Sequence, residues 1–330
     1  MERSMSMLVT DPAYAALAHH MPPAEFALLQ EDISAIRRLK QERNAIILAH
    51  NYQTPEIYHG VADITGDSLA LAREAVTAQA DVIVMAGVHF MAETAKLLNP
   101  SKIVLIPDAR AGCSLAESIT PADVRGLRAR YPGVPLIAYV NTSAAVKAEV
   151  DYCCTSGNAK QVVEFAARAA GTDRVVMLPD RYLAANTACE TAVQIIPWDG
   201  ACEVHERFTR ADIAQVRAQY DNVTVLAHPE CPEEVIAAAD FAGSTAGMAQ
   251  FIAQHQPARV ALITECSMSD NLASQFRAVD FVKPCNLCPH MKRINLGNIR
   301  HALETMQGAI EIEPDLAARA RVSVERMLAI

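Results

Sequence analysis

The run AIILAHNY at residues 45–52 sets the pattern for the whole sequence. Its first five residues are apolar, as in a strand that is buried on both faces, and its last three residues suit a polar loop. Similar runs recur as PLIAYVNT at 135–142 and as NVTVLAHPE at 222–230. Short apolar runs alternate with amphipathic helical stretches along the rest of the chain. This alternation predicts an α/β protein with parallel strands and crossover helices.

Several segments have the apolar composition and the flanking turn residues of strands. They are Ala45–Ala49, Asp81–Ala86, Lys102–Ile106, Pro135–Val140, Arg174–Leu178, Ala192–Ile196, Asn222–Ala227, Arg259–Ile263 and Asp280–Val282. Because helical segments fill most of the intervals between them, we expect parallel pairing.

A turn of small and hydroxyl-bearing residues follows each of the three polar loops. The turns are Gly66–Ser68, Thr155–Gly157 and Gly243–Thr245, and each precedes a helical stretch. Free N–H groups at a helix start, beside a serine or threonine hydroxyl, can bind a carboxylate or a phosphate. The same residues also serve as ordinary helix caps. Because the order of loop, turn and helix recurs with a period of roughly 88 residues, the chain is predicted to contain three related units.

A cysteine occupies one equivalent place in each unit. A late strand leads to a proline and, four to six residues further on, to Cys113, Cys202 or Cys288. These cysteines follow the polar loop of their unit by 60 to 63 residues, and the other six cysteines show no such threefold equivalence. Loops at the carboxyl ends of parallel strands face one side of a sheet, where ligands bind. Three units around a pseudo-threefold axis would therefore bring three thiolates together, for either a catalytic metal ion or an iron-sulfur cluster.

Composition limits the classes of function. The chain has 330 residues, of which 51% are hydrophobic and 20% charged, and a formal net charge of -9. Its lysines and arginines are scattered, so no basic stripe indicates a nucleic-acid partner. No apolar stretch reaches the roughly 18 residues that span a membrane, and the N-terminal region lacks a signal-peptide pattern. We therefore expect a cytoplasmic protein, in which nine cysteines indicate metal or redox chemistry rather than a disulfide framework.

Motifs in a fixed order connect the sequence with a known family. They are AHNYQ at 49–53, GDSL at 66–69, FMAE at 90–93, YVN at 139–141, CTS at 154–156, CEVH at 202–205, HPEC at 228–231 and GST at 243–245. With these motifs, the chain resembles the quinolinate synthases from about Ala45 to Leu296.

This resemblance implies a fold and a cofactor. It implies three αβα sandwich domains with short parallel sheets, arranged around a central active-site cavity. A 4Fe-4S cluster would be held there by Cys113, Cys202 and Cys288, one from each domain, with one iron left open. We expect a helical extension over residues 1–40 and the three units over 41–120, 121–208 and 209–330, the last with C-terminal helices.

The resemblance also implies a transferase/dehydratase-type reaction. Iminoaspartate, delivered by L-aspartate oxidase, would condense with dihydroxyacetone phosphate to give quinolinate, phosphate and two waters in de novo NAD biosynthesis. Loss of hydroxide from carbon needs a Lewis acid, and the open iron could act as one.

The family's site residues carry over to matching positions of this chain. Among the catalytic candidates, Tyr52 and Glu230 are expected to transfer protons and isomerise the triose, and His50 and His205 to orient carboxylate or phosphate groups. The expected substrate-binding residues are His50, Ser68, Tyr139, Asn141, Ser156, His228, Glu230, Ser244 and Thr245.

The third cluster ligand departs from the pattern of some family members, which carry three cysteines at two-residue spacings. This chain has only Cys285 and Cys288 there. Counting from Pro284 and matching the basic segment Met291–Arg293 both select Cys288 as the ligand, which leaves open whether Cys285 forms a disulfide with it under oxidation. No second CxxC pair exists to complete an all-cysteine zinc site.

Two other functions compete with this interpretation. A metal or redox sensor could bind a cluster through the same cysteines, but it would not need polar side chains at equivalent loop ends. A hydro-lyase could use the cluster on a simple hydroxy acid, but the several anion-binding turns favour a site for two substrates.

Overall fold

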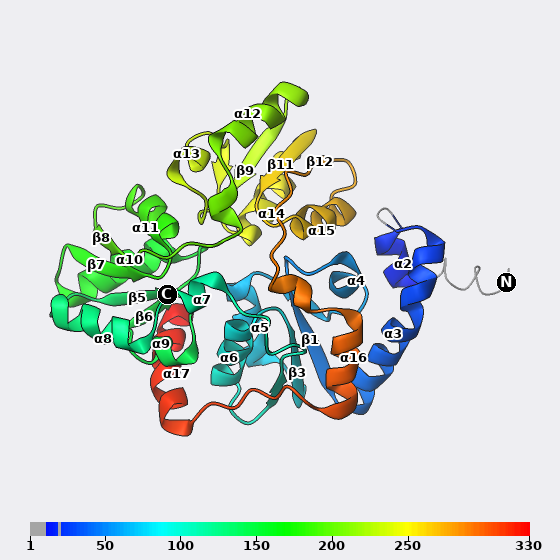
Figure 1. The fold of residues 1–330 in the computed structure, drawn as a ribbon, viewed down its shortest axis with the longest axis horizontal. Helices are drawn as coiled ribbons and strands as arrows, with labels where there is room; N and C mark the ends of the chain where they lie inside the picture. The colour runs from blue at the N-terminus through cyan, green and yellow to red at the C-terminus, as the bar shows by residue number, and fades with distance from the viewer. Residues whose placement is uncertain (1–10, 19–20) are drawn as a thin grey trace.

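Three parallel sheets of four strands form the framework of the computed structural model, which describes residues 11–18 and 21–330. They lie at the corners of a triangle, with helices covering their faces (Figure 1). This arrangement confirms the expected fold of three αβα sandwiches. Each sheet belongs to one continuous stretch of chain, called here the first, second and third unit.

The first unit carries the run that opens the sequence pattern. Its apolar residues form a central strand that is almost entirely buried. The strands are β1 (Ala45–His50), β2 (Ile64–Gly66), β3 (Val82–Ala86) and β4 (Ile103–Leu105), and the helices are α4 (Pro55–Tyr58), α5 (Ser68–Thr77), α6 (His89–Leu98) and α7 (Ser114–Glu117).

The second and third units repeat this plan. In the second, α8 (Pro121–Arg130) leads to β5 (Leu136–Tyr139), α9 (Ala144–Lys147), β6 (Tyr152–Cys154), α10 (Ala159–Ala170), β7 (Arg174–Leu178), α11 (Arg181–Ala188), β8 (Gln194–Pro197) and the 3-10 turn η1 (His205–Arg207). In the third, α12 (Arg210–Gln219) leads to β9 (Thr224–Ala227), α13 (Glu233–Ile236), β10 (Phe241–Ala242), α14 (Thr245–His255), β11 (Arg259–Ile263), α15 (Ser267–Gln275), β12 (Asp280–Val282) and η2 (Met291–Arg293).

The strand order is the same in all three sheets. In chain order within a unit, the second strand pairs with the first, the first with the third, and the third with the fourth, all in parallel. The order therefore reverses beside the first strand, where open α/β sheets bind ligands at their carboxyl ends. The loop that follows the first strand is the polar loop found in the sequence.

The sequence-based strands agree with nine of the strands and miss the second one of each unit. The missed strands are β2, β6 and β10, which have three, three and two residues. Such short edge strands lack the length over which an alternating or continuous apolar pattern can be recognised.

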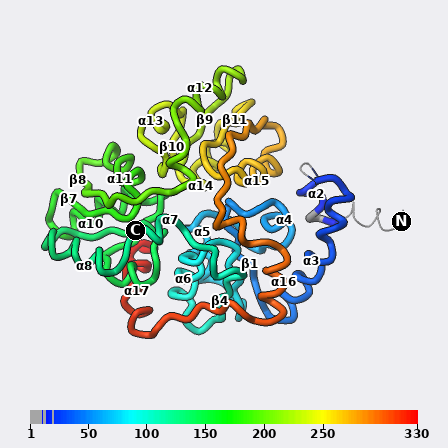
Figure 2. The backbone as a smooth tube through the Cα atoms, viewed as in Figure 1, coloured from blue at the N-terminus to red at the C-terminus, as the bar shows by residue number. Residues whose placement is uncertain are grey.

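Helices from both ends of the chain pack on the first two units. At the N-terminal end, α2 (Pro12–Leu17) precedes α3 (Pro23–Glu42), and α3 packs against α16 (Leu296–Thr305). The last helix, α17 (Pro314–Ala329), packs against α6, α9 and β6. Figure 2 shows this return of the chain, from the third unit along the first to the second.

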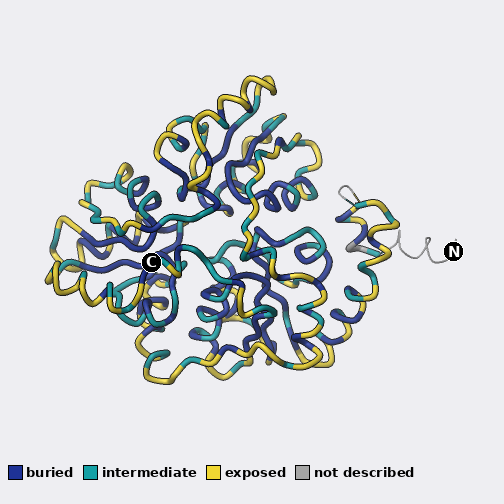
Figure 3. The backbone as a smooth tube through the Cα atoms, in the orientation of Figure 1, coloured by how far each residue is buried: buried dark blue, intermediate teal, exposed yellow. Residues whose placement is uncertain are grey.

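The strands form the buried core of each unit, and the helices expose their outer faces (Figure 3). Lysine and arginine residues are absent from the interior of the strands, where leucine, isoleucine and valine pack. Within the described part of the chain, no helix combines the length and hydrophobicity required to cross a membrane.

Candidate active site

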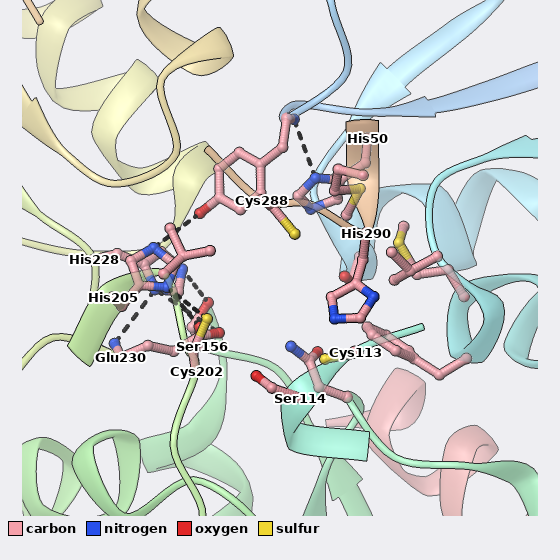
Figure 4. A pocket seen from close by; sticks show the side chains of 18 of the residues that line it. His50, Cys113, Ser114, Ser156, Cys202, His205, His228, Glu230, Cys288 and His290 are labelled. Atoms are coloured by element: carbon pink, nitrogen blue, oxygen red, sulfur yellow. Dashed lines mark hydrogen bonds and ion pairs between the residues drawn. The ribbon is translucent and has the colours of Figure 1, made fainter. Parts of the chain in front are cut away.

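A cavity lies where the three units meet. All three supply side chains to its wall, including the residues labelled in Figure 4. Most of the expected site residues line it: His50, Tyr52, Ser68, Cys113, Tyr139, Asn141, Ser156, Cys202, His205, His228, Glu230, Thr245 and Cys288. The threefold loops thus converge on one cavity, as their places at the strand ends require.

The three cysteines of the cavity have the same local structure. Each one precedes a short helical turn, α7, η1 or η2, and its carbonyl accepts a hydrogen bond from the backbone N–H four residues later, at 3.0 to 3.1 Å. Each sulfur also accepts hydrogen bonds from the backbone N–H groups two and three residues later. Figure 4 shows Cys113, Cys202 and Cys288 around a common space. The repeat detected in the sequence is therefore a repeat of backbone geometry.

Burial dominates the ionisation of these thiols. It raises the pKa of Cys113 to about 12, despite the hydrogen bonds from Ala116 and Leu115. Burial likewise raises the pKa of Cys202 and of Cys288, again against their backbone hydrogen bonds. A coordinated metal reverses this effect, because a coordinating thiol is deprotonated outright.

The cysteines are spread more widely than ligands of a single metal ion. Within residues 11–18 and 21–330, the one set of three side chains whose ligand atoms come within 4.8 Å of one another is Cys202, His205 and Glu230. Three thiolates around one zinc ion would lie about 4 Å apart, since each Zn–S bond is about 2.3 Å. Wider spacing and paired N–H donors at each sulfur suit an iron-sulfur cluster better than zinc.

Two histidines from the polar loops present the same nitrogen to the cavity. The backbone N–H of Tyr52 donates to Nδ1 of His50 at 3.2 Å, and that of Glu230 donates to Nδ1 of His228 at 3.3 Å. In a neutral ring, Nε2 must then carry the proton. Burial lowers the pKa of His50 to about 4 and that of His228 to about 3. Both rings are therefore neutral hydrogen-bond donors at pH 7.

Glu230 is the buried carboxylate of the cavity. It accepts a short hydrogen bond from Tyr139 Oη, and its Oε2 lies 2.8 Å from Nδ1 of His205. Burial alone would raise the pKa of Glu230, but His205, His228 and Tyr139 outweigh that effect and hold the pKa well below its usual range. The carboxylate is thus ionised and held by groups from the second and third units. His205 also stacks on His228, with ring centroids 4.6 Å apart.

The small turns supply hydroxyl and amide groups. Ser156 Oγ lies 3.4 Å from His228 Nε2, and Thr245 Oγ1 accepts a hydrogen bond from Asn51 at 2.8 Å. The side-chain oxygen of Asn141 is buried and has no hydrogen-bond partner within the described residues. An unpartnered buried polar atom beside a cavity is suited to a ligand.

One expected binding residue has a different place. Ser244 does not line the cavity, and its hydroxyl instead caps α14 by accepting from the backbone N–H of Gly247 at 3.2 Å. Asp67 caps α5 in the same way, which leaves the adjacent Ser68 at the cavity wall.

The comparison with known proteins covers the part of the chain that forms the three units. The family model described as quinolinate synthetase A protein matches residues 34–329. The chain belongs to this family of enzymes. It is 64% identical over 315 residues to quinolinate synthase 1 of Mesorhizobium japonicum, which covers 96% of each chain. It is 63% identical over 317 residues to quinolinate synthase of Agrobacterium fabrum, which covers 96% of this chain and 91% of that one.

A further relative is more distant. Quinolinate synthase of Caulobacter vibrioides is 56% identical over 319 residues, which covers 97% of this chain and 87% of that one. The agreement therefore extends through all three units and both C-terminal helices.

In this member of the quinolinate synthase family, Cys285 does not pair with the third expected ligand, Cys288. Cys285 forms a disulfide with Cys266, whereas Cys288 is a free thiol. The open question of a disulfide between Cys285 and Cys288 is thus answered by the pairing of Cys285 with Cys266. Backbone pairing explains the difference, because the bridge between Glu265 and Asn286 brings the neighbouring Cys266 and Cys285 together.

Sequence analysis missed the residues that support the Cys288 turn. Glu265 is fully buried, and its carboxylate lies 2.9 Å from Lys292 Nζ and 3.4 Å from the backbone N–H of Cys288. Lys292 also donates to the carbonyl of Tyr52 at 2.7 Å. The available signal was a glutamate two residues after the strand Arg259–Ile263, but Glu265 lies outside the repeated cysteines and polar loops.

Proposed function

We propose that the chain condenses iminoaspartate with dihydroxyacetone phosphate, giving quinolinate, phosphate and two waters for de novo NAD biosynthesis. Membership of the quinolinate synthase family supports quinolinate formation as the activity. The observation that carries the proposal is the set of three equivalent cysteine turns facing one cavity with the polar loops. L-aspartate oxidase would supply the iminoaspartate.

We propose further that Cys113, Cys202 and Cys288 hold a 4Fe-4S cluster. Three cysteines leave one iron of such a cluster without a protein ligand. The bound cluster would supply this iron as a Lewis acid for the loss of hydroxide. The two N–H donors at each sulfur and the wide spacing of the thiols support this assignment.

The polar groups of the cavity suit a dicarboxylate and a phosphate ester. His50 and His228 offer neutral Nε2–H donors, which can bind carboxylate oxygens without a buried positive charge. The hydroxyls of Ser68, Ser156 and Thr245 and the amide of Asn141 provide further contacts. Such groups would orient the substrates but would not exchange protons with them.

Proton transfer is assigned to Glu230 and Tyr52. Isomerisation of the triose moves a proton between neighbouring carbons, which requires a base held beside them. Glu230 is an ionised carboxylate in the cavity wall, and Tyr139 and His205 fix its two oxygens. Tyr52 reaches the same cavity from the first unit.

Anaerobic purification followed by iron, sulfide and activity measurements tests the proposal. We expect about four irons and four sulfides per chain and quinolinate formation from the two substrates. An iron-free protein would contradict the cluster. A clustered protein that does not form quinolinate would contradict the reaction, and dehydration of a simple hydroxy acid by that protein would favour a hydro-lyase.

A further inference from the structure

Thr264 lies behind two of the side chains that line the cavity. It directly follows β11, is 1% exposed and does not itself line the cavity. Its Oγ1 lies 2.6 Å from Tyr52 Oη and 2.9 Å from His205 Nε2. Tyr52 belongs to the first unit and His205 to the second, so a residue of the third unit links them.

The two contacts of this link meet at one hydroxyl. Oε2 of Glu230 is 2.8 Å from Nδ1 of His205, so Nε2 is the ring nitrogen left for the Thr264 hydroxyl. That hydroxyl has a single proton and can donate it to only one of its two neighbours. Thr264 therefore couples the hydrogen bonds of Tyr52 and His205 at the cavity wall.

The direct contact between the two side chains is longer than either contact with the threonine. Tyr52 Oη and His205 Nε2 are 3.4 Å apart, at the outer limit of a hydrogen bond. The equivalent position after the third strand is Gly87 in the first unit and Pro179 in the second, so the hydroxyl is specific to the third unit.

We infer that Thr264 is a positioning residue of the reaction, an inference that rests on the proposed function. Its hydroxyl joins the side chains of Tyr52 and His205 and holds both in place at the cavity wall. Thr264 thereby sets the geometry in which two cavity residues meet the substrates, without touching the substrates itself.

The variants Thr264→Val and Thr264→Ser separate the hydroxyl from the shape of the side chain. Valine keeps the volume and the β-branch, and serine keeps the hydroxyl. For Thr264→Val we expect kcat to fall about 10- to 100-fold while KM for both substrates stays within about twofold. Thr264→Ser should stay within about threefold of wild type in kcat. Both variants should contain wild-type amounts of iron and sulfide.

Thr187→Val is the matched control. Thr187 is 5% exposed, and its hydroxyl donates to the carbonyl of Leu183 within α11 at 2.6 Å. The same substitution at this buried threonine should leave kcat unchanged. If the valine variant at position 264 is insoluble, Thr264→Ala takes its place with the same expected loss.

A second measurement asks whether Thr264 acts through its neighbours. In a His205→Gln background, Thr264→Val should lower kcat by less than about twofold further, because the link is already broken. Wild-type kcat in Thr264→Val, an equal loss in the valine and serine variants, or full additivity with His205→Gln would overturn the inference. Absence of quinolinate formation by the wild-type protein would overturn the proposed function instead.

Discussion

Glu230 is the buried charge around which the polar side chains of the cavity are arranged. Tyr139 and His205 each hold one of its oxygens. These neighbours offset the cost of burying a carboxylate. The residue can therefore remain ionised although its side chain is buried.

Glu230→Gln tests this charge. The amide keeps the shape but cannot act as a base, and its NH₂ group cannot accept from His205 or Tyr139. We expect kcat to fall about 10²- to 10⁴-fold with the iron content unchanged, as measured by quinolinate formation and iron analysis. Glu234→Gln, at an exposed position of α13, is the control and should behave as wild type. An active Glu230→Gln variant would remove Glu230 from the proton transfers.

The neutral His228 should make the stability of the protein depend on pH. Its pKa is about 3 in the folded protein, against an ordinary value of 6.5. Between these values the unfolded chain binds more protons, so stability is full above pH 6.5 and is lost as the pH falls. As the pH falls from 7 to 5, this one group should lower the free energy of unfolding by about 2 kcal/mol.

Urea unfolding of His228→Gln at both pH values checks the prediction. The variant should lose about 2 kcal/mol less than wild type between pH 7 and pH 5. His301→Gln, at an exposed position of α16, should reproduce the wild-type loss. An unchanged pH dependence in His228→Gln would show that the imidazole titrates normally.

At the scale of single residues, repetition decided what could be predicted. His50, Asn141 and His228 were found because equivalent loops carry them, and the family motifs added Tyr52 and Glu230. Thr264 has no polar counterpart in the other units, so nothing in the sequence marked it. Its role depends on which atoms it meets across units, and spacing along a chain does not contain that information.

The elements that hold the three cavity cysteines are three short turns rather than long helices. In each, the sulfur and the carbonyl of the cysteine accept hydrogen bonds from backbone N–H groups of the turn that follows. The turns fix the direction of each thiol, which would lower the ordering cost of binding the proposed cluster.

Substitution of single cysteines tests these turns. Cys113→Ser, Cys202→Ser and Cys288→Ser should each lose most of the iron, because a serine oxygen is a poor ligand for an iron-sulfur cluster. Iron and sulfide analysis after anaerobic purification measures the loss. Retention of the cluster in Cys202→Ser would show that the wrong thiol had been assigned.

Two other cysteines serve as controls for that series. Cys231→Ser should keep the iron because Cys231 lies in the core of the third unit and does not line the cavity. Cys266→Ser should also keep it, although the disulfide with Cys285 is lost, because Glu265 and Lys292 still hold the Cys288 turn.

At the scale of elements, long buried strands were predictable and short paired ones were not. Strands such as β3 and β11 are continuous apolar runs. The edge strands β2, β6 and β10 exist because a neighbouring strand offers them hydrogen bonds, not because of their own composition. The disulfide between Cys266 and Cys285 escaped prediction for the same reason, since backbone pairing brings the two cysteines together.

On the scale of the whole molecule, the C-terminal helix joins two units. Residues Ala320, Val324 and Met327 of α17 are fully buried, and the Ser323 hydroxyl donates to the carbonyl of Lys147 at 2.8 Å. Packing against α6 of the first unit and against α9 and β6 of the second makes α17 part of the contact between them. The relative position of Cys113 and Cys202 therefore depends on a helix that does not line the cavity.

Met327→Ala should weaken this contact. Truncation of a fully buried methionine leaves a cavity, which should lower the free energy of unfolding by about 2 to 5 kcal/mol. Urea unfolding followed by fluorescence of the single tryptophan, Trp198 in the second unit, measures the change. Val322→Ala on the same helix, where the side chain is 45% exposed, should change stability by less than about 0.5 kcal/mol. Equal effects of the two substitutions would show that α17 is not held by its buried face.

The equivalence of the three cysteine turns also bears on why the units share one chain. A homotrimer of a single unit could place three identical thiols around its threefold axis. Its three loop ends would then be identical as well. In this chain, the loop ends are His50 with Tyr52, Tyr139 with Asn141, and His228 with Glu230. Covalent fusion thus keeps the three cysteine turns equivalent while it allows the three loop ends to carry different side chains.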